Sequence, residues 1–154
     1  MNTELPNIRH LSINELEEYF QNIGEKKFRV KQVHEWLWQK HAHHFDDMTN
    51  LSKDLRAKLA QTFSLPALKI DTVQYSEDGT IKSRFRTHDH HLVEGVLIPT
   101  DERKTACVSS QIGCSLSCKF CATGYMDRKR NLTYDEIYDQ VVLINKESEE
   151  KFNK

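Results

Sequence analysis

Cysteine is absent from the first 106 residues of this chain, and long hydrophobic runs are absent throughout. No apolar stretch approaches the roughly 20 residues that a membrane-spanning helix needs. The N-terminus lacks a basic start followed by an apolar run, so we expect no signal peptide. Dispersed cysteines, which a disulfide-stabilised secreted domain would carry, are also missing. These absences predict a cytoplasmic protein without a membrane partner.

The four cysteines of the chain all lie in one segment, at Cys107, Cys114, Cys118 and Cys121. The last three are spaced Cys-x3-Cys-x2-Cys. Three thiolates that converge on one point suit an iron–sulfur cluster, which a fourth thiolate normally completes. A cluster held by three thiolates leaves one iron open to another ligand. We expect the chemistry of the chain at that iron.

A structural zinc site is the main alternative, because short cysteine spacings are common in zinc sites and eight histidines could supply a fourth ligand. Zinc sites more often show two ligand pairs that are well separated along the chain. Here Phe120 directly precedes the third ligand, and small residues surround the ligands: Gly113, Ser115, Ser117, Ala122 and Gly124. This composition favours a loop wrapped closely around a bulky cofactor.

The motif Cys-x3-Cys-x-aromatic-Cys resembles the signature of radical S-adenosylmethionine enzymes. Longer strings narrow the resemblance, since residues 107–114 read CVSSQIGC, residues 118–124 read CKFCATG and residues 130–133 read RNLT. These strings resemble the RlmN/Cfr family of RNA adenosine methyltransferases. The upstream strings GEKKFR (24–29) and MTNLSK (48–53) resemble the N-terminal region of RlmN, so the resemblance covers nearly the whole chain.

The resemblance implies a cofactor set and a substrate. Cys114, Cys118 and Cys121 would hold a [4Fe–4S] cluster whose open iron binds S-adenosylmethionine, and Phe120 would pack near that cofactor. The reaction would be methylation of adenosine carbon 2 in 23S ribosomal RNA, with transfer RNA as a further candidate substrate and carbon 8 as an alternative target atom. An electron-donor protein would be a partner. The alternative function is a non-catalytic RNA-binding module with a structural Cys3His zinc site.

Glu94 and Cys107 are the candidate catalytic residues. From the residues alone, Cys107 could be a buried strand cysteine. Glu94 interrupts an apolar strand, where an unpaired buried acid costs several kcal/mol, so it either faces water at a sheet edge or is functional. The resemblance implies that Glu94 accepts the proton that the adenine carbon loses. It also implies that Cys107 forms a disulfide with a second, methyl-carrying cysteine, which this chain does not contain.

Hydrophobic periodicity predicts helices over residues 12–23, 28–41 and 52–63, and a capping box, Ser12 with Glu15, begins the first. Alternation predicts strands over 68–76, 80–86, 91–98 and 104–111, with Asp78-Gly79 as a hairpin turn. A second capping box, Thr133 with Glu136, begins a helix through about residue 147. The predicted class is α/β. We expect an N-terminal helical, RNA-binding accessory domain (1–64), a connecting β-meander (65–100) and the start of a radical-SAM barrel with the cluster loop (101–154).

A strand, a cofactor loop and a helix make the first unit of a (β/α) barrel, whose active site lies on the loops that follow the strands. A complete barrel needs about 200 residues or more. We therefore expect an N-terminal fragment of a longer enzyme, inactive by itself. Its unpaired strand edge would favour self-association.

Net charge is −1, so RNA binding would depend on local clusters of cations. One cluster precedes the second predicted helix, at Lys26, Lys27, Arg29 and Lys31, and its alternative is a solvated surface. The other, Arg128-Lys129-Arg130, follows the cysteine loop and would attract phosphates. We expect the two histidine groups, residues 41–44 and 88–91, to be exposed beside turns.

Overall fold

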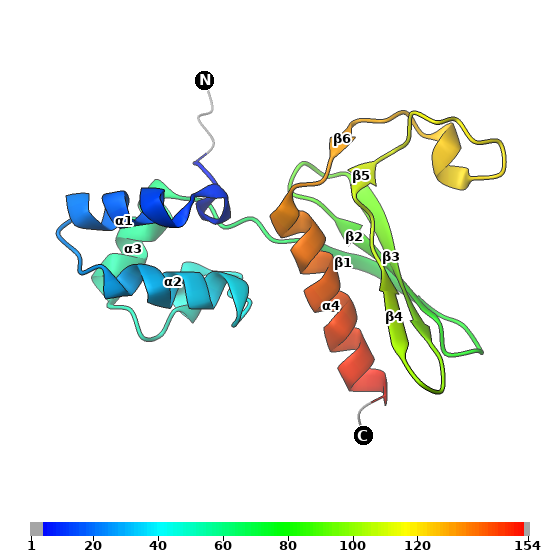
Figure 1. Cartoon of the computed structure of the whole chain (residues 1–154), viewed down its shortest axis with the longest axis horizontal. Helices are drawn as coiled ribbons and strands as arrows, with labels where there is room; N and C mark the ends of the chain where they lie inside the picture. The colour runs from blue at the N-terminus through cyan, green and yellow to red at the C-terminus, as the bar shows by residue number, and fades with distance from the viewer. Residues whose placement is uncertain (1–4, 153–154) are drawn as a thin grey trace. The chain divides into compact units, whose positions relative to one another are not determined.

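The structure, a computed structural model, describes residues 5–152 (Figure 1). The chain divides into two compact units, with the boundary between Pro66 and Ala67. Within the described range, no helix combines the length and the apolar character needed to cross a bilayer.

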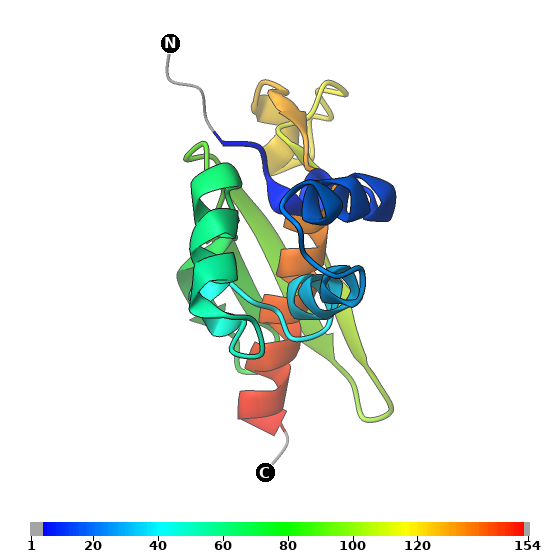
Figure 2. The same ribbon diagram turned by 90° about the vertical axis from the view of Figure 1, so that its left-hand side faces the viewer.

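The first unit is helical, as predicted. It contains α1 (Ile13–Asn22), α2 (Phe28–Trp38) and α3 (Lys53–Thr62), with short 3-10 turns η1 (Ile8–His10) and η2 (Phe45–Asp47). The predicted capping box is present, because the Ser12 hydroxyl accepts the N–H of Glu15 and the Glu15 carboxylate accepts the N–H of Ser12 at 2.7 Å. In both views α3 runs crosswise to α1 and α2 (Figures 1 and 2). The side chains of Phe20, Val33 and Leu59 are fully buried between the helices.

The second unit is built on a four-stranded antiparallel sheet in the order β1 (Lys69–Tyr75), β2 (Ile81–Arg86), β3 (Leu92–Pro99) and β4 (Lys104–Cys107). The predicted hairpin turn joins β1 to β2, and Gly79 adopts a φ of 85° there. The long helix α4 (Tyr134–Phe152) covers one face of the sheet, and its Ile144 shares a core with Phe85. Gly95 permits this packing, since a Cβ there would lie 2.8 Å from Ile144 Cδ1. Helices followed by a β-meander and a final helix confirm the predicted α/β class.

The predicted strand 104–111 is interrupted. It ends as β4 at Cys107, and β5 (Gln111–Ile112) instead pairs with β6 (Arg130–Asn131). Gln140 of α4, which is fully buried, accepts the Ser109 N–H and donates to the Ser109 carbonyl, both at 2.9 Å. The Ser109 hydroxyl also donates to the Glu94 carbonyl. A helix side chain thus takes the backbone hydrogen bonds that a continuous strand would have used.

Candidate active site

The three clustered cysteines lie on the cysteine loop, residues 113–129, which leaves β5 and returns to β6 (Figure 1, yellow to orange). Backbone hydrogen bonds close its base, from Lys129 N–H to the Ile112 carbonyl at 2.9 Å and from Cys114 N–H to the Met126 carbonyl at 3.1 Å. A 3-10 turn, η3 (Ala122–Tyr125), follows the third cysteine. The loop therefore has a fixed base and a folded tip made by its own backbone.

Two glycines bring the limbs of this loop together. Gly113 has a φ of 70°, and a Cβ there would lie 2.7 Å from the Asp127 carbonyl carbon and closer still to its oxygen. A Cβ at Gly124 would lie 2.5 Å from the Cys118 carbonyl oxygen. Real side chains do not tolerate such approaches, so the path of the loop requires glycine at both positions.

Backbone N–H groups point at two of the candidate ligand sulfurs. Leu116 N–H donates to Cys114 Sγ at 3.4 Å. Hydrogen bonds from the backbone N–H groups of Gly124 and Thr123 lower the pKa of Cys121. Donors of this kind stabilise the thiolate, which is the form that binds metal. The three half-exposed thiols are therefore chemically suited to hold an iron–sulfur cluster.

A group of three other possible metal ligands lies away from the cysteines in residues 5–152. It consists of His88, Asp89 and Glu136, whose ligand atoms all lie within 4.8 Å of one another.

Phe120, the predicted cofactor neighbour, is 93% exposed at the tip of the loop. Leu116 and Tyr125 are each 77% exposed on the same loop. The Tyr125 hydroxyl donates to the Lys119 carbonyl at 2.8 Å, which ties the two sides of the tip together. The ring of Phe120 is therefore exposed to solvent, and its packing against a cofactor stays a prediction.

Glu94 and Cys107 lie on the same face of the sheet. Cys107 is paired with Val96, and Val96 is two residues beyond Glu94 on β3, so all three project to one side. Cys107 is exposed, and the interpretation of it as a buried strand cysteine is therefore wrong. The structure brings the two predicted catalytic residues together on neighbouring strands.

The sequence predicts Glu94 either as an edge residue that faces water or as a functional residue, and the structure agrees only in part with the first. β3 lies inside the sheet, so Glu94 is not at an edge, although its face is open to solvent and its side chain is 52% exposed. Lys82 of β2 holds the carboxylate, with 2.9 Å between Lys82 Nζ and Glu94 Oε1. Lys82 is not among the residues that the sequence predicted for the site. Alternation along β2, which places Lys82 on the outer face, was the signal that could have found it.

Arg130 is not available to attract phosphates, which corrects one prediction. Its guanidinium donates to both carboxylate oxygens of Asp89, at 2.8 and 2.9 Å, and to both of Glu136, at 2.7 and 2.8 Å. These hydrogen bonds hold the pKa of Asp89 well below its usual range. Burial raises the pKa of Glu136, but hydrogen bonds from Arg130 and the Thr133 N–H outweigh it and the net shift is downward.

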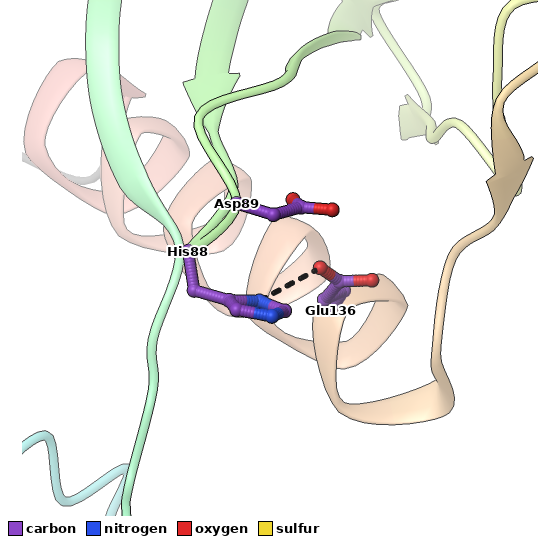
Figure 3. A group of neighbouring side chains, drawn as sticks. All are labelled: His88, Asp89 and Glu136. Carbon is purple, nitrogen blue, oxygen red and sulfur yellow. Dashed lines mark ion pairs between the residues drawn. The ribbon is translucent and has the colours of Figure 1, made fainter. Parts of the chain in front are cut away.

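Figure 3 shows Asp89 and Glu136 beside His88, whose Nδ1 lies 3.6 Å from Glu136 Oε1. Because Arg130 already neutralises both carboxylates, these residues form an ion-pair network and not a metal site. Asp89 lies in the turn between β2 and β3, and Glu136 lies in the first turn of α4. The network, Arg130 with Asp89 and Glu136, thus fastens the returning limb of the cysteine loop to the sheet and the helix.

The first basic cluster is also partly engaged. Lys27 pairs with Glu17 at 3.0 Å, and Arg29 donates to Gln32 at 2.8 Å and to the Asn50 carbonyl at 3.2 Å. The structure therefore gives this cluster contacts within the helical unit, and phosphate binding by it stays a prediction.

Comparison with known proteins relates both units to one family. Residues 6–65 match the family model described as the ribosomal RNA large subunit methyltransferase N-terminal domain. A probable dual-specificity RNA methyltransferase RlmN from Cytophaga hutchinsonii is 60% identical over 145 residues, which cover 94% of this chain and 40% of the relative. A protein of the same name from Flavobacterium psychrophilum is 53% identical over 154 residues, covering 100% of this chain and 44% of the relative.

The fold has a solved counterpart. A radical SAM methyltransferase from Sphaerobacter thermophilus superposes with a TM-score of 0.79 at 40% identity. The match covers 94% of this chain and 43% of that protein. The chain thus spans about two fifths of the length of the relatives it matches.

Proposed function

We propose that this chain, which belongs to the RlmN family of radical SAM RNA methyltransferases, forms the cluster-binding part of a longer enzyme. The proposed enzyme methylates carbon 2 of adenosine in 23S ribosomal RNA. Transfer RNA is its proposed second substrate. The cysteine loop carries this proposal. It presents three thiols on a backbone closed by two glycines, and Leu116 N–H donates to Cys114 Sγ. The backbone N–H groups of Gly124 and Thr123 lower the pKa of Cys121. Cytoplasmic location follows from the RNA substrate and belongs to the same proposal.

Cys114, Cys118 and Cys121 would hold a [4Fe–4S] cluster, with S-adenosylmethionine at the open iron and Phe120 beside it. When bound, this pair supplies the one-electron chemistry for methylating an unactivated carbon, using an electron from a donor protein. The loop itself contributes binding and orientation. Its backbone N–H groups stabilise ligand thiolates, and its hydrogen-bonded base fixes where the first ligand, Cys114, leaves β5.

Glu94 would act as the proton acceptor. A methyl group that replaces hydrogen on an adenine carbon requires that the carbon lose a proton, and an exposed carboxylate held in place by Lys82 can accept it. Cys107 presents its thiol on the same face. We propose that it resolves a covalent intermediate in which the methyl-derived carbon joins a second cysteine to the adenine. The Cys107 thiolate attacks the sulfur of that cysteine, the S–S bond forms as the S–C bond breaks, and the carbon takes the electron pair and a proton to become the methyl group. The second cysteine must come from outside this chain, because its other cysteines are the proposed cluster ligands.

Iron content tests this proposal directly. After reconstitution without oxygen, the chain is expected to bind about four iron and four sulfide ions and to absorb visible light. The triple variant Cys114→Ala/Cys118→Ala/Cys121→Ala should lose both signals, whereas Cys107→Ala, which removes a thiol outside the set, should keep them. A colourless protein with one zinc ion per chain would support the zinc-binding alternative instead.

We also propose that the chain does not complete the reaction alone. The second cysteine lies elsewhere, and in the described sheet β4 is an edge strand, a position that favours self-association. Labelled methyl transfer from S-adenosylmethionine to ribosomal RNA should therefore stay at the level of the triple cysteine variant. Turnover above that level would show that the chain is catalytically complete.

A further inference from the structure

The strand β2 carries a row of cations on one side. Ile81, Ser83 and Phe85 are buried toward α4, so the alternate residues Lys82, Arg84 and Arg86 project from the opposite face. Their side chains are 44%, 45% and 46% exposed. No described helix of this unit packs on that face in the way that α4 packs on the other. Each side chain of the row is therefore partly accessible to solvent.

The same face carries the two candidate catalytic residues. Arg84 is paired directly with Glu94, and Lys82 is paired with Val96, which in turn is paired with Cys107. Directly opposed residues of antiparallel strands project to the same side of a sheet. The cation row, the carboxylate and the thiol thus share one surface that crosses β2, β3 and β4.

The carboxylates on this surface do not use up the row's hydrogen-bonding capacity. Asp71, at the irregularity between Ile70 and Thr72 of β1, accepts from Arg84 Nε at 2.7 Å and also from Arg86 Nη2. Glu94 is the other carboxylate, and it pairs with Lys82. Arg84 also donates to Thr72 Oγ1 at 3.2 Å. Two guanidiniums share one acid and each has five N–H donors, so these partners do not use all of the donors. Asp71 itself is only 10% exposed, but the two guanidiniums are 45% and 46% exposed, so a phosphate can reach them from the solvent side.

We propose that this surface, Lys82, Arg84 and Arg86 on the exposed face of the sheet, binds the phosphate backbone of the RNA substrate. The proposal rests on the proposed function, because it is Glu94 and Cys107 that must reach the target adenine. RNA that brings a base to those residues must lie over the face that carries them. Phosphate contacts position a nucleic acid without reading its sequence, and a row of cations beside the reacting groups suits that role.

Charge removal tests the surface. A labelled RNA hairpin with an unpaired adenosine is titrated with the chain at several salt concentrations, and binding is followed by fluorescence anisotropy. Arg84→Gln/Arg86→Gln should bind about tenfold more weakly at moderate salt, with a salt slope smaller by about 1.4 to 1.8. Arg84→Lys/Arg86→Lys keeps the charge and should restore most of the slope. The matched control, Lys146→Gln/Lys151→Gln, removes two exposed cations from α4 and should bind like the wild type.

Asp71→Asn should act in the opposite direction. It removes the carboxylate that engages Arg84 and Arg86, so RNA should bind more tightly, by about threefold or more, and with a steeper salt dependence. A sheet surface whose ion pairs serve only the fold would not gain affinity for RNA from this change. Thermal melting of each variant is the control for an intact sheet, and each variant should melt close to the wild type.

Equal RNA affinity of the wild type and Arg84→Gln/Arg86→Gln would overturn the proposal, as would a wild type that binds no RNA. A change in oligomeric state without a change in RNA affinity would assign the surface to a second copy of the chain and would overturn it too. Iron binding by the cysteine loop is measured without RNA. Failure of the surface proposal is therefore distinguishable from failure of the proposed function.

Discussion

Gly113→Ala is expected to abolish iron incorporation by the cysteine loop. The added Cβ would lie 2.7 Å from the Asp127 carbonyl carbon, where the two limbs of the loop meet. Those atoms belong to the backbone, so the clash is relieved only if the limbs separate. Separation displaces Cys114 relative to the other ligands, and a cluster that loses one of three thiolates is not retained. Iron per chain after reconstitution should fall to the level of the triple cysteine variant.

Gly24→Ala is the matched control for this change. Gly24 also has a positive φ, 76° against 70° at Gly113, but a Cβ there would meet no atom within 4 Å. Both variants therefore carry the same backbone strain of about 1 kcal/mol, and only Gly113→Ala adds a steric clash. Normal iron content in Gly113→Ala would show that the loop opens freely, against the geometry that we describe.

Arg130→Met is expected to destabilise the sheet unit by about 2 to 3 kcal/mol at neutral pH. The change leaves Glu136, whose side chain is 6% exposed, as a buried carboxylate without its cation, and removes both hydrogen bonds to Asp89. Because the Arg130 side chain is 28% exposed, the loss of unfolding free energy should be smaller than for a fully buried ion pair. Urea unfolding measures the difference. Arg128→Met is the control, because Arg128 is exposed and donates to Asn131 Oδ1 at 2.7 Å, an exposed neutral partner.

The effect of Arg130→Met should depend on pH. Arg130 lowers the pKa of Asp89 and of Glu136 in the folded protein, so the network stabilises the fold above the unfolded pKa of about 4. That stability is lost as the pH falls through the folded pKa values. The difference in the free energy of unfolding between the wild type and Arg130→Met should therefore be largest at pH 7 and should shrink below about pH 4. A difference that is constant with pH would mean that Arg130 acts through packing alone.

The ion-pair network also bears on the site. Arg130 stands in β6, directly after the cysteine loop, and holds that strand to Asp89 and Glu136. The returning limb of the loop is therefore anchored by contacts that do not involve the cysteines. We expect Arg130→Met to lower iron retention even where the helical unit stays folded.

Local sequence determined much of this protein. The capping box at Ser12 and the turn at Asp78-Gly79 each act within a few residues, and both form as predicted. At Thr133, the Glu136 carboxylate accepts the Thr133 N–H, which is one half of the predicted box. The cysteine spacing likewise belongs to one loop. Together with the longer strings around it, this spacing predicted the family, and the family resemblance implied the cofactors. Such features are readable because their partners lie three or four residues apart, where backbone geometry alone fixes the contact.

Only the tertiary structure decided which distant residues meet. Gln140 binds the backbone of Ser109, 31 residues away, where β4 has ended. Arg130 pairs with Asp89, 41 residues away, and is therefore not available for the phosphate binding that the run Arg128-Lys129-Arg130 predicted. Glu94 and Cys107 share a face because of the order and register of the strands. The strand pattern gives the side on which a residue projects, but pairing between strands decides what lies beside it, and that depends on the packing of the whole unit.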